Sequence, residues 1–308
     1  MKGIYYGLDG GGTRCRLAIW NEEKQIIYQD EGASSNPYAV GFEQAAKNVL
    51  LLLDKARGQQ ILQGMSIKAF CFGSAGLARQ VEQAKWKAVF DSYFMEDFPR
   101  VLVSDAEILL TGSHLDVSGI ALIAGTGSIC MGRNDRGETV RSGGLGSALG
   151  DEGSAWWIAI QAVRRTLRSK EGRDLETTMD GTIRSFFHLG DLQECVPFFN
   201  DKNLAKATVA QFAPYVTSFA DKGDPLAKAI LKEAAEELVH LVISVQSRLA
   251  MPFRQRLTLA GGVLEQDKTI RALFLKGLPS EIVVCPTKGT ALEGALVLAY
   301  ACHERVYL

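Results

Sequence analysis

Residues 3–20 read GIYYGLDGGGTRCRLAIW, and this stretch carries the strongest fold signal in the sequence. Two apolar runs, residues 3–8 and 14–20, flank the turn Asp-Gly-Gly-Gly-Thr at residues 9–13. Short apolar runs separated by glycine-rich turns are typical of β-strands. The chain is therefore predicted to begin with a strand, a glycine turn and a second strand.

The same pattern returns near residue 120. Residues 118–124 are apolar, the turn Gly-Thr-Gly-Ser follows at 125–128, and residues 129–133 form a second apolar run. Between the two hairpins, residues 42–57 and 81–94 have apolar positions at helical spacing, and residues 67–72 and 100–104 have the character of buried strands. A repeated unit of this kind predicts two related α/β domains in one chain.

The second half of the chain contains more helix. Residues 151–168 are predicted to hold a helix that is entered through a glycine-rich turn. Asp224 followed by Pro225 is a helix start signal and opens a long helix that runs to about residue 249. Short strands are expected at 257–259 and 281–285, and a closing helix at 289–302.

The amino-acid composition argues against a nucleic-acid-binding, secreted or membrane-spanning protein. The 308 residues carry 34 basic and 35 acidic side chains, so charge gives no reason to expect nucleic acid or an anionic membrane as a partner. Asp9 interrupts the first apolar run, which argues against a signal peptide, and no apolar segment approaches membrane-spanning length. Six scattered cysteines fit reduced core residues of a cytoplasmic protein.

The two glycine turns are candidate phosphate sites. Successive glycines expose backbone N–H groups without side chains in the way, and such groups suit phosphate oxygens. Asp9 at the end of a strand could hold Mg²⁺, which prefers carboxylate oxygens. Neither turn matches the P-loop pattern, and each returns into a strand, unlike a Rossmann dinucleotide site. Each turn taken alone is equally compatible with an ordinary hairpin.

Three further segments contain polar residues that have either a functional or a purely structural role. Asp105 ends the strand at 100–104 and is either a catalytic base or the cap of the next helix. Residues 143–154 combine glycines, carboxylates and a hydroxyl, which suits a sugar-binding loop, although Asp151 or Ser154 could simply cap a helix. Asn36 is either a turn residue or a sugar contact.

Taken in order, six motifs resemble the N-acetylglucosamine kinase group of the BadF-type ATPases, within the sugar kinase, actin and chaperone ATPase superfamily. The motifs are Asp9-Gly-Gly-Gly-Thr13, Gly73-Ser-Ala-Gly76, Ser104-Asp105-Ala106, Ala124-Gly-Thr-Gly-Ser128, Gly150-Asp-Glu-Gly-Ser154 and Ala260-Gly-Gly-Val263. The resemblance spans nearly the whole chain. The ordered set is more specific for the superfamily than for a substrate.

The resemblance implies a fold of two ribonuclease-H-like domains that flank a nucleotide and sugar cleft. The first domain would comprise residues 1–116 with 290–308, and the second would comprise 117–289 with helical insertions. Family members use ATP with Mg²⁺, and a homodimer is expected. The implied reaction is phosphorylation of the 6-hydroxyl of an amino sugar, with N-acetylglucosamine as the first choice.

The resemblance also assigns roles to residues of this sequence. Asp105 would be the catalytic base and would touch the sugar, and Asp9 would hold the metal ion. The predicted nucleotide contacts are Gly10, Gly11, Gly12, Thr13, Gly125, Thr126, Gly127, Gly261 and Gly262. The predicted sugar contacts besides Asp105 are Asn36, Ser74, Gly144, Leu145 and Asp151.

One position departs from the resembled pattern. Leu145 stands where the animal N-acetylglucosamine kinases have Trp, so glucosamine and N-acetylmuramic acid remain alternative substrates. An activator ATPase of the same family is a second alternative, but it places cysteines for an iron–sulfur cluster, and the cysteines here are scattered. A non-catalytic sugar sensor is the third, and it would not need Asp105 together with two phosphate turns.

Overall fold

The structure, a computed structural model, describes residues 2–115, 118–201, 203–250 and 255–307. The chain folds into two compact units, and each is an α/β domain built around one sheet. Unit 1 comprises Met1–Ser118 and Pro286–Leu308, and unit 2 comprises Gly119–Cys285. The first domain boundary expected from the sequence, at residues 116 and 117, lies outside the described residues.

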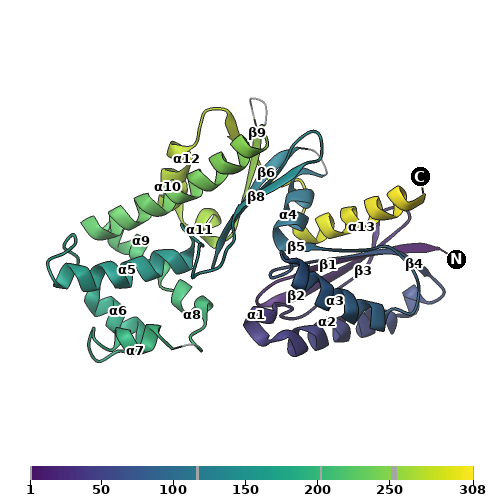
Figure 1. Cartoon of the computed structure of the whole chain (residues 1–308), viewed down its shortest axis with the longest axis horizontal. Coiled ribbons are helices and arrows are strands. Elements are labelled where there is room, and N and C mark those ends of the chain that lie inside the picture. The colour runs from purple at the N-terminus through teal and green to yellow at the C-terminus, as the bar shows by residue number, and fades with distance from the viewer. Residues whose placement is uncertain (1, 116–117, 202, 251–254, 308) are drawn as a thin grey trace. The chain divides into compact units, whose positions relative to one another are not determined.

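Unit 1 contains a five-stranded mixed sheet in the order β3-β2-β1-β4-β5 (Figure 1). Its strands are β1 (Gly3–Gly10), β2 (Arg14–Asn21), β3 (Ile26–Ala33), β4 (Ser66–Ser74) and β5 (Arg100–Ser104). The first three strands pair antiparallel through short turns, whereas β1, β4 and β5 run parallel. Helical connections between β3, β4 and β5 make the parallel pairings possible.

Alternation along β4 explains why this sheet is covered on both faces. Phe70 and Phe72 join the core under α2 (Phe42–Arg57) and α3 (Gln80–Tyr93), whereas Ala69 and Cys71 point to the other face. That second face packs against α4 (Asp105–His114) and α13 (Ala291–Tyr307). Two short helices, α1 (Pro37–Val40) and a 3₁₀ turn at Gln60–Leu62, complete the unit.

Unit 2 repeats the topology of unit 1. Its sheet has the order β10-β9-β6-β7-β8, with antiparallel β6–β7 and β7–β8 pairs and parallel β6–β9 and β9–β10 pairs. The strands are β6 (Gly119–Ala124), β7 (Ser128–Arg133), β8 (Thr139–Gly143), β9 (Gln255–Ala260) and β10 (Ile282–Val284). Position by position, β6 to β10 correspond to β1 to β5, which confirms the predicted internal repeat and the α/β class.

Helices inserted between β8 and β9 make unit 2 the more helical half (Figure 1). They are α5 (Ala155–Lys170), α6 (Asp180–Phe187), α7 (Cys195–Phe199), α8 (Lys206–Ala210), α9 (Ala213–Asp221) and α10 (Pro225–Arg248). Two more, α11 (Gly262–Glu265) and α12 (Lys268–Gly277), follow β9. The long helix α10 packs against β6, β7 and β8, and α5 packs against α10. Within the described residues, no helix has both the length and the apolarity that a bilayer crossing requires.

The predicted long helix of unit 2 starts where the sequence indicates. The Asp224 side chain accepts a hydrogen bond from the Ala227 N–H, and Pro225 occupies the first turn. The helix expected within residues 151–168 is α5, which begins at Ala155 with Ser154, one of the two possible caps, as its N-cap. Asp151 instead adopts a left-handed conformation, with φ of 63°, and lies under the second glycine turn.

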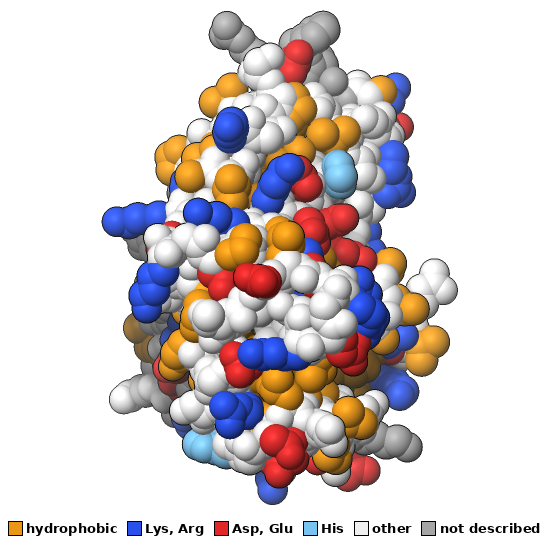
Figure 2. Space-filling view, turned by 90° about the vertical axis from the view of Figure 1, so that its left-hand side faces the viewer, with side chains coloured by type: hydrophobic (Ala, Val, Ile, Leu, Met, Phe, Trp, Pro, Cys, Tyr) orange, Lys and Arg blue, Asp and Glu red, His pale blue; other side chains and the backbone are white. Residues whose placement is uncertain are grey.

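The face of the molecule that carries the inserted helices mixes both signs of charge. Figure 2 shows Lys and Arg side chains interspersed with Asp and Glu, with small groups of hydrophobic side chains between them. On this face neither sign of charge forms a continuous surface.

Candidate functional site

In unit 1, three parallel strands end at the same level of the sheet. Gly10 of β1 pairs with Ser74 of β4, and Ser74 pairs with Ser104 of β5. Three of the motifs on which the resemblance rests lie at these strand ends: residues 9–13, 73–76 and 104–106. The carboxyl ends of parallel strands are where ligands bind in α/β sheets. The register therefore gathers residues that are far apart in the sequence at one edge.

The first glycine turn is held tightly by its neighbours. A Cβ on Gly10 would lie 2.2 Å from Ser35 Oγ and 2.7 Å from Ser74 Oγ, so only glycine fits there. The Ser34 hydroxyl donates to Gly11 O at 3.1 Å, and Ala75 N donates to Gly10 O at 3.0 Å. Gly12 and Thr13 remain exposed at the end of the hairpin. The backbone of this turn is thus preorganised while its tip stays open to a ligand.

Ser74, one of the predicted sugar contacts, lies in the interior of unit 1 and not on its surface. Its side chain is fully buried, and its Oγ lies 3.3 Å from Ser35 Oγ. The hydroxyl therefore supports the glycine turn from below, since both serines contact the position of Gly10.

Asp9 is paired with Arg16 across the hairpin. The two residues face each other in the β1–β2 register, and the Arg16 Nη2 donates to Asp9 Oδ2. The carboxylate is mostly buried, with 12% of the side chain accessible. The neighbouring guanidinium holds the carboxylate in one orientation at the start of the turn.

Asp105 is the first residue of α4, and Ser104 is its cap. The Ser104 side chain accepts from the Glu107 N–H, which answers the alternative that Asp105 is present only to cap the helix. Asp105 is half-buried, and its Oδ1 accepts from Ala106 N at 2.9 Å. Burial raises the pKa of this carboxyl, the Ala106 N–H opposes that shift, and the charge of Asp9 adds to it. A carboxylate whose pKa is raised by burial is a better proton acceptor than an exposed one.

Asn36 both caps a helix and borders the glycine turn. Its Oδ1 accepts from Tyr38 N at 2.9 Å and so starts α1. Its Nδ2 lies 3.8 Å from where a Cβ on Gly12 would be, and its Oδ1 lies 3.7 Å from the same position on Gly76. Asn36 is therefore positioned between the ends of β1 and β4, where its amide N–H₂ can donate to a ligand.

In unit 2 the second glycine turn occupies the equivalent place, after β6. Gly125 N donates to Gly127 O at 2.9 Å, and Ala155 N at the start of α5 donates to Gly125 O at 2.9 Å. Thr126 is exposed at the tip. Gly261, with φ of 93°, lies directly against this turn, because a Cβ there would be 2.4 Å from Ala124 O and 2.9 Å from Gly125 N.

Asp151 and the loop at 143–150 lie beside the second turn. Ser128 N donates to Asp151 Oδ1 at 3.4 Å, and a Cβ on Gly127 would be 2.8 Å from the same carboxylate oxygen. Burial raises the pKa of Asp151, and Lys206 lowers it. Gly144 N donates to Ser128 O at 2.9 Å, which ties the loop to the turn. Leu145 is 58% exposed on this loop.

Sequence reasoning missed three residues of these sites. Arg16 was detectable, since antiparallel pairing of the two predicted strands brings residues 9 and 16 face to face. Ser35 carries no local signal, because its contact with Ser74 depends on folding of the sheet. Lys206, whose Nζ lies 3.9 Å from Asp151 Oδ2, comes from an inserted helix that matches no motif.

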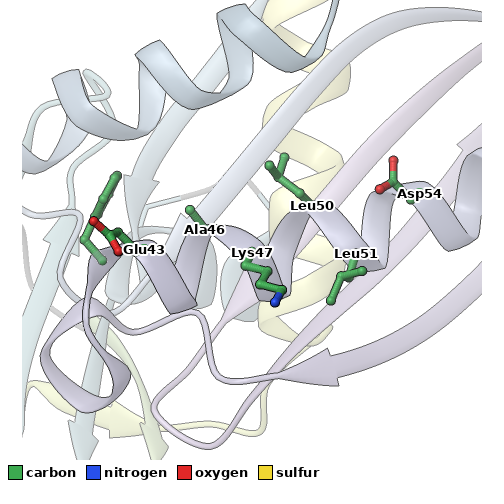
Figure 3. Close-up of a pocket in the computed structure, with 7 residues that line it drawn as sticks. Glu43, Ala46, Lys47, Leu50, Leu51 and Asp54 are labelled. Carbon is green, nitrogen blue, oxygen red and sulfur yellow. The ribbon is translucent and has the colours of Figure 1, made fainter.

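A groove on α2 is unrelated to these residues. It is lined by Phe42, Glu43, Ala46, Lys47, Leu50, Leu51 and Asp54 (Figure 3). None of the predicted site residues lines it, and it is an open surface feature along one helix. Each unit therefore has its own candidate functional residues, at the strand ends of its own sheet.

Comparison with known proteins agrees with the repeated topology. An N-acetylmuramic acid/N-acetylglucosamine kinase from Clostridium acetobutylicum is 31% identical over 298 residues, which cover 95% of this chain and 97% of that protein. A glucosamine kinase from Vibrio cholerae is 27% identical and covers 98% of each chain.

Solved structures show the same fold. One from Chromobacterium violaceum, described as a candidate N-acetylglucosamine kinase, has a TM-score of 0.72 and 26% identity, and covers 96% of this chain and 98% of that one. A ROK family glucokinase from Streptomyces griseus shares the fold at a TM-score of 0.52 and 16% identity, with 97% and 100% covered.

The family model of the BadF/BadG/BcrA/BcrD ATPases matches residues 6–298, which include both glycine turns and all of both sheets except the first three residues of β1. On the strength of this match across nearly its whole length, the chain belongs to the BadF/BadG/BcrA/BcrD ATPase family.

Proposed function

We propose that this protein is an ATP-dependent amino-sugar kinase that phosphorylates the 6-hydroxyl of its substrate. The observation that carries the proposal is Asp105, a half-buried carboxyl with a raised pKa at the same strand-end edge as a glycine turn. Membership in an ATPase family supports ATP as the phosphoryl donor. The names of the relatives, all amino-sugar kinases, support the acceptor.

Asp105 acts as the general base in this proposal. Its Oδ1 is engaged by Ala106 N, which orients the carboxylate and leaves Oδ2 to accept the proton of the sugar hydroxyl. Removing that proton as the oxygen attacks phosphorus makes the hydroxyl a better nucleophile. Burial raises the pKa of Asp105, which strengthens its carboxylate as a base.

Each unit supplies one phosphate-binding turn. Gly10–Thr13 in unit 1 and Gly125–Gly127 in unit 2 present exposed tips on fixed backbones. Gly261 and Gly262 at the end of β9 would contact the nucleoside, since Gly261 lies against the second turn. Backbone donors that are fixed in advance stabilise the charge of a transferring phosphoryl group without reorganisation.

The residues around Asp9 fit a magnesium ion bound through the nucleotide. Among the described residues, no three or more His, Cys, Asp and Glu side chains are grouped so that they could hold a metal ion by themselves. A nucleotide-associated Mg²⁺ needs only one or two carboxylates, with phosphates and water as the remaining ligands. Asp9, mostly buried at the first turn, is the carboxylate that would hold it. When bound, Mg²⁺ neutralises charge on the β- and γ-phosphates.

The sugar is assigned to Asp105, Asn36 and the 143–151 loop. Asn36 offers an amide N–H₂ beside the first turn, and Asp151 offers a carboxylate beside the second. Ser74 contributes from a buried position by supporting the turn. Gly144 and Leu145 would adjoin the substituent at carbon 2, and N-acetylglucosamine is the first expected substrate.

An ATP-consumption assay with a panel of sugars tests the proposal. The panel contains N-acetylglucosamine, glucosamine, N-acetylmuramic acid, N-acetylmannosamine and glucose. We expect ADP formation with at least one of the first three, and a product phosphorylated at the 6-hydroxyl by NMR. Consumption of ATP with none of them, or phosphorylation at another hydroxyl, would contradict the proposal.

The proposal also covers the oligomeric state of the protein and its location in the cell. We expect a homodimer that acts in the cytoplasm on small molecules, with neither nucleic acid nor membrane as a partner. Light scattering after size exclusion measures the mass directly, against 33.5 kDa for one chain. A monomer at micromolar concentration would contradict the dimer and leave the kinase proposal intact.

Gly261→Ala is expected to weaken ATP binding. The new Cβ would collide with the backbone at Ala124 and Gly125, and φ of 93° is unfavourable for alanine. The collision should destabilise unit 2 by about 1–3 kcal/mol and raise the KM for ATP by displacing the second turn. Gly181→Ala is the control, because a Cβ there meets nothing within 4 Å. Equal KM values in both variants would count against the role of the turn.

The pH dependence of the reaction should follow the ionisation of the Asp105 carboxyl. Activity falls as the base becomes protonated, so the acid limb of kcat/KM for the sugar should lie above the pKa of 3.8 that is ordinary for an aspartate. Profiles of kcat/KM for the sugar, measured at saturating ATP, test this, and an acid limb at or below pH 3.8 would contradict Asp105 as the base.

A further inference from the structure

The ammonium of Lys206 lies beside the loop assigned to the sugar. Lys206 is the first residue of α8, and its Nζ is 3.9 Å from Asp151 Oδ2. The same Nζ lies 3.8 Å from where a Cβ on Gly146 would be. An inserted helix of unit 2 thus delivers a positive charge to both ends of the 146–151 segment.

The ion pair with Asp151 leaves the Lys206 ammonium able to bind a second anion. A separation of 3.9 Å is longer than an N–H···O hydrogen bond, and 49% of the Lys206 side chain is accessible. A lysine ammonium has three donors in total, so a second anion can be bound without breaking the pair with Asp151. Glu152, the other acid of this segment, lies near Gly150 and adds negative charge there.

Two exposed leucines lie on the same loop as the contacts of the Lys206 ammonium. Leu145 is 58% exposed and Leu149 is 78% exposed, and they flank the turn closed by Leu149 N donating to Gly146 O at 3.2 Å. Positive φ values at Gly143, Gly144 and Gly146 show that this loop conformation depends on glycine. Two exposed leucines beside one cation form a surface that suits a ligand group with both a methyl and a carboxylate.

We propose that Lys206, Leu145 and Leu149 form a subsite for an acidic ether substituent on the amino sugar, of the kind that N-acetylmuramic acid carries. The ammonium would pair with the carboxylate, and the leucines would contact the methyl group. This inference rests on the proposed function, in which Asp151 and the 143–151 loop contact the sugar. It makes Lys206 a specificity residue that distinguishes acidic from neutral amino sugars.

Kinetics with matched sugars test the subsite. Lys206→Met keeps an unbranched side chain that is one atom shorter and removes its charge. We expect kcat/KM for N-acetylmuramic acid to fall about 10- to 100-fold and that for N-acetylglucosamine to change less than about threefold. Lys206→Arg should retain most of the activity toward N-acetylmuramic acid. Lys232→Met, which alters an exposed lysine of α10 in the same unit, is the control and should change neither value.

Binding measurements separate the subsite from the kinase proposal. Calorimetric titration of each sugar into the wild-type chain and Lys206→Met should show weaker binding of N-acetylmuramic acid alone in the variant. Such a result in a protein without turnover would overturn the kinase proposal and keep the subsite. Equal losses for both sugars would show that Lys206 acts only by neutralising Asp151, and no loss for either would also overturn the subsite.

Discussion

Asp105→Asn is expected to lower turnover by about 100- to 10,000-fold while ATP and sugar binding change little. Asparagine has the same shape and can still accept the Ala106 N–H at Oδ1, so the start of α4 is preserved. It cannot accept a proton from the sugar hydroxyl. The loss should therefore appear in kcat, because the missing interaction belongs to the transition state.

The same substitution should not destabilise the fold at neutral pH. The pKa of Asp105 is raised in the folded chain above its ordinary 3.8, so ionising it costs stability as pH rises through the folded pKa. The neutral asparagine avoids that cost. We expect an equal or higher Tm at pH 7 and no gain below about pH 3.8, where the aspartate is protonated in both states.

Steady-state kinetics and thermal unfolding of one preparation decide between the possible roles. Asp180→Asn is the control, since Asp180 also begins a helix but lies in unit 2 and pairs with Lys170 at 3.3 Å. Near-normal turnover of Asp105→Asn would remove Asp105 as the base. Lost turnover together with a much lower Tm at pH 7 would make its role structural.

Gly294→Ala is expected to cause the largest loss of stability. Helices α4 and α13 cross so closely that a Cβ on Gly294 would be 1.9 Å from Ile108 O and 2.6 Å from Gly112 N. Backbone atoms cannot move aside as a flexible side chain can, so the helices would have to separate. We expect a cost of about 3 kcal/mol or more, at the upper end of overpacking effects.

The crossing matters for activity because α4 begins at Asp105. Separation of α4 from α13 would displace that carboxyl from the strand ends, so Gly294→Ala should lose turnover as well as stability. Gly112→Ala should behave similarly, because its Cβ would lie 2.0 Å from Thr290 O. Both variants are measured by thermal unfolding and by the kinase assay.

A matched control is available within unit 1. Gly58 at the end of α2 has helical dihedral angles, and a Cβ there would make ordinary contacts at 3.6 Å. Gly58→Ala should be neutral or stabilising by about 0.4–1 kcal/mol. If all three alanine variants unfold at the wild-type temperature, the close crossing of α4 and α13 is wrong.

Local sequence patterns were enough to predict the two repeated α/β domains of this protein. The hairpin at residues 3–20 and its recurrence near residue 120 correspond to β1–β2 and β6–β7 of two sheets with one topology. These features are readable because each depends on neighbours in sequence: apolar runs, glycine turns, and the Asp224-Pro225 helix start. The choice between the two possible caps of α5 was not local: Ser154 caps the helix, whereas tertiary contacts hold Asp151 against the second glycine turn.

The assembly of each site depended on strand register and helix packing, which act over long sequence separations. Pairing of Gly10 with Ser74 and of Ser74 with Ser104 aligns three strand ends, and no local pattern encodes that alignment. The raised pKa of Asp105 follows from its burial in the folded unit. Lys206 reaches Asp151 across 55 residues of inserted helices, so its place beside the loop follows from packing alone. The residue types of the glycine hairpins thus follow from the sequence, and their surroundings follow from the fold.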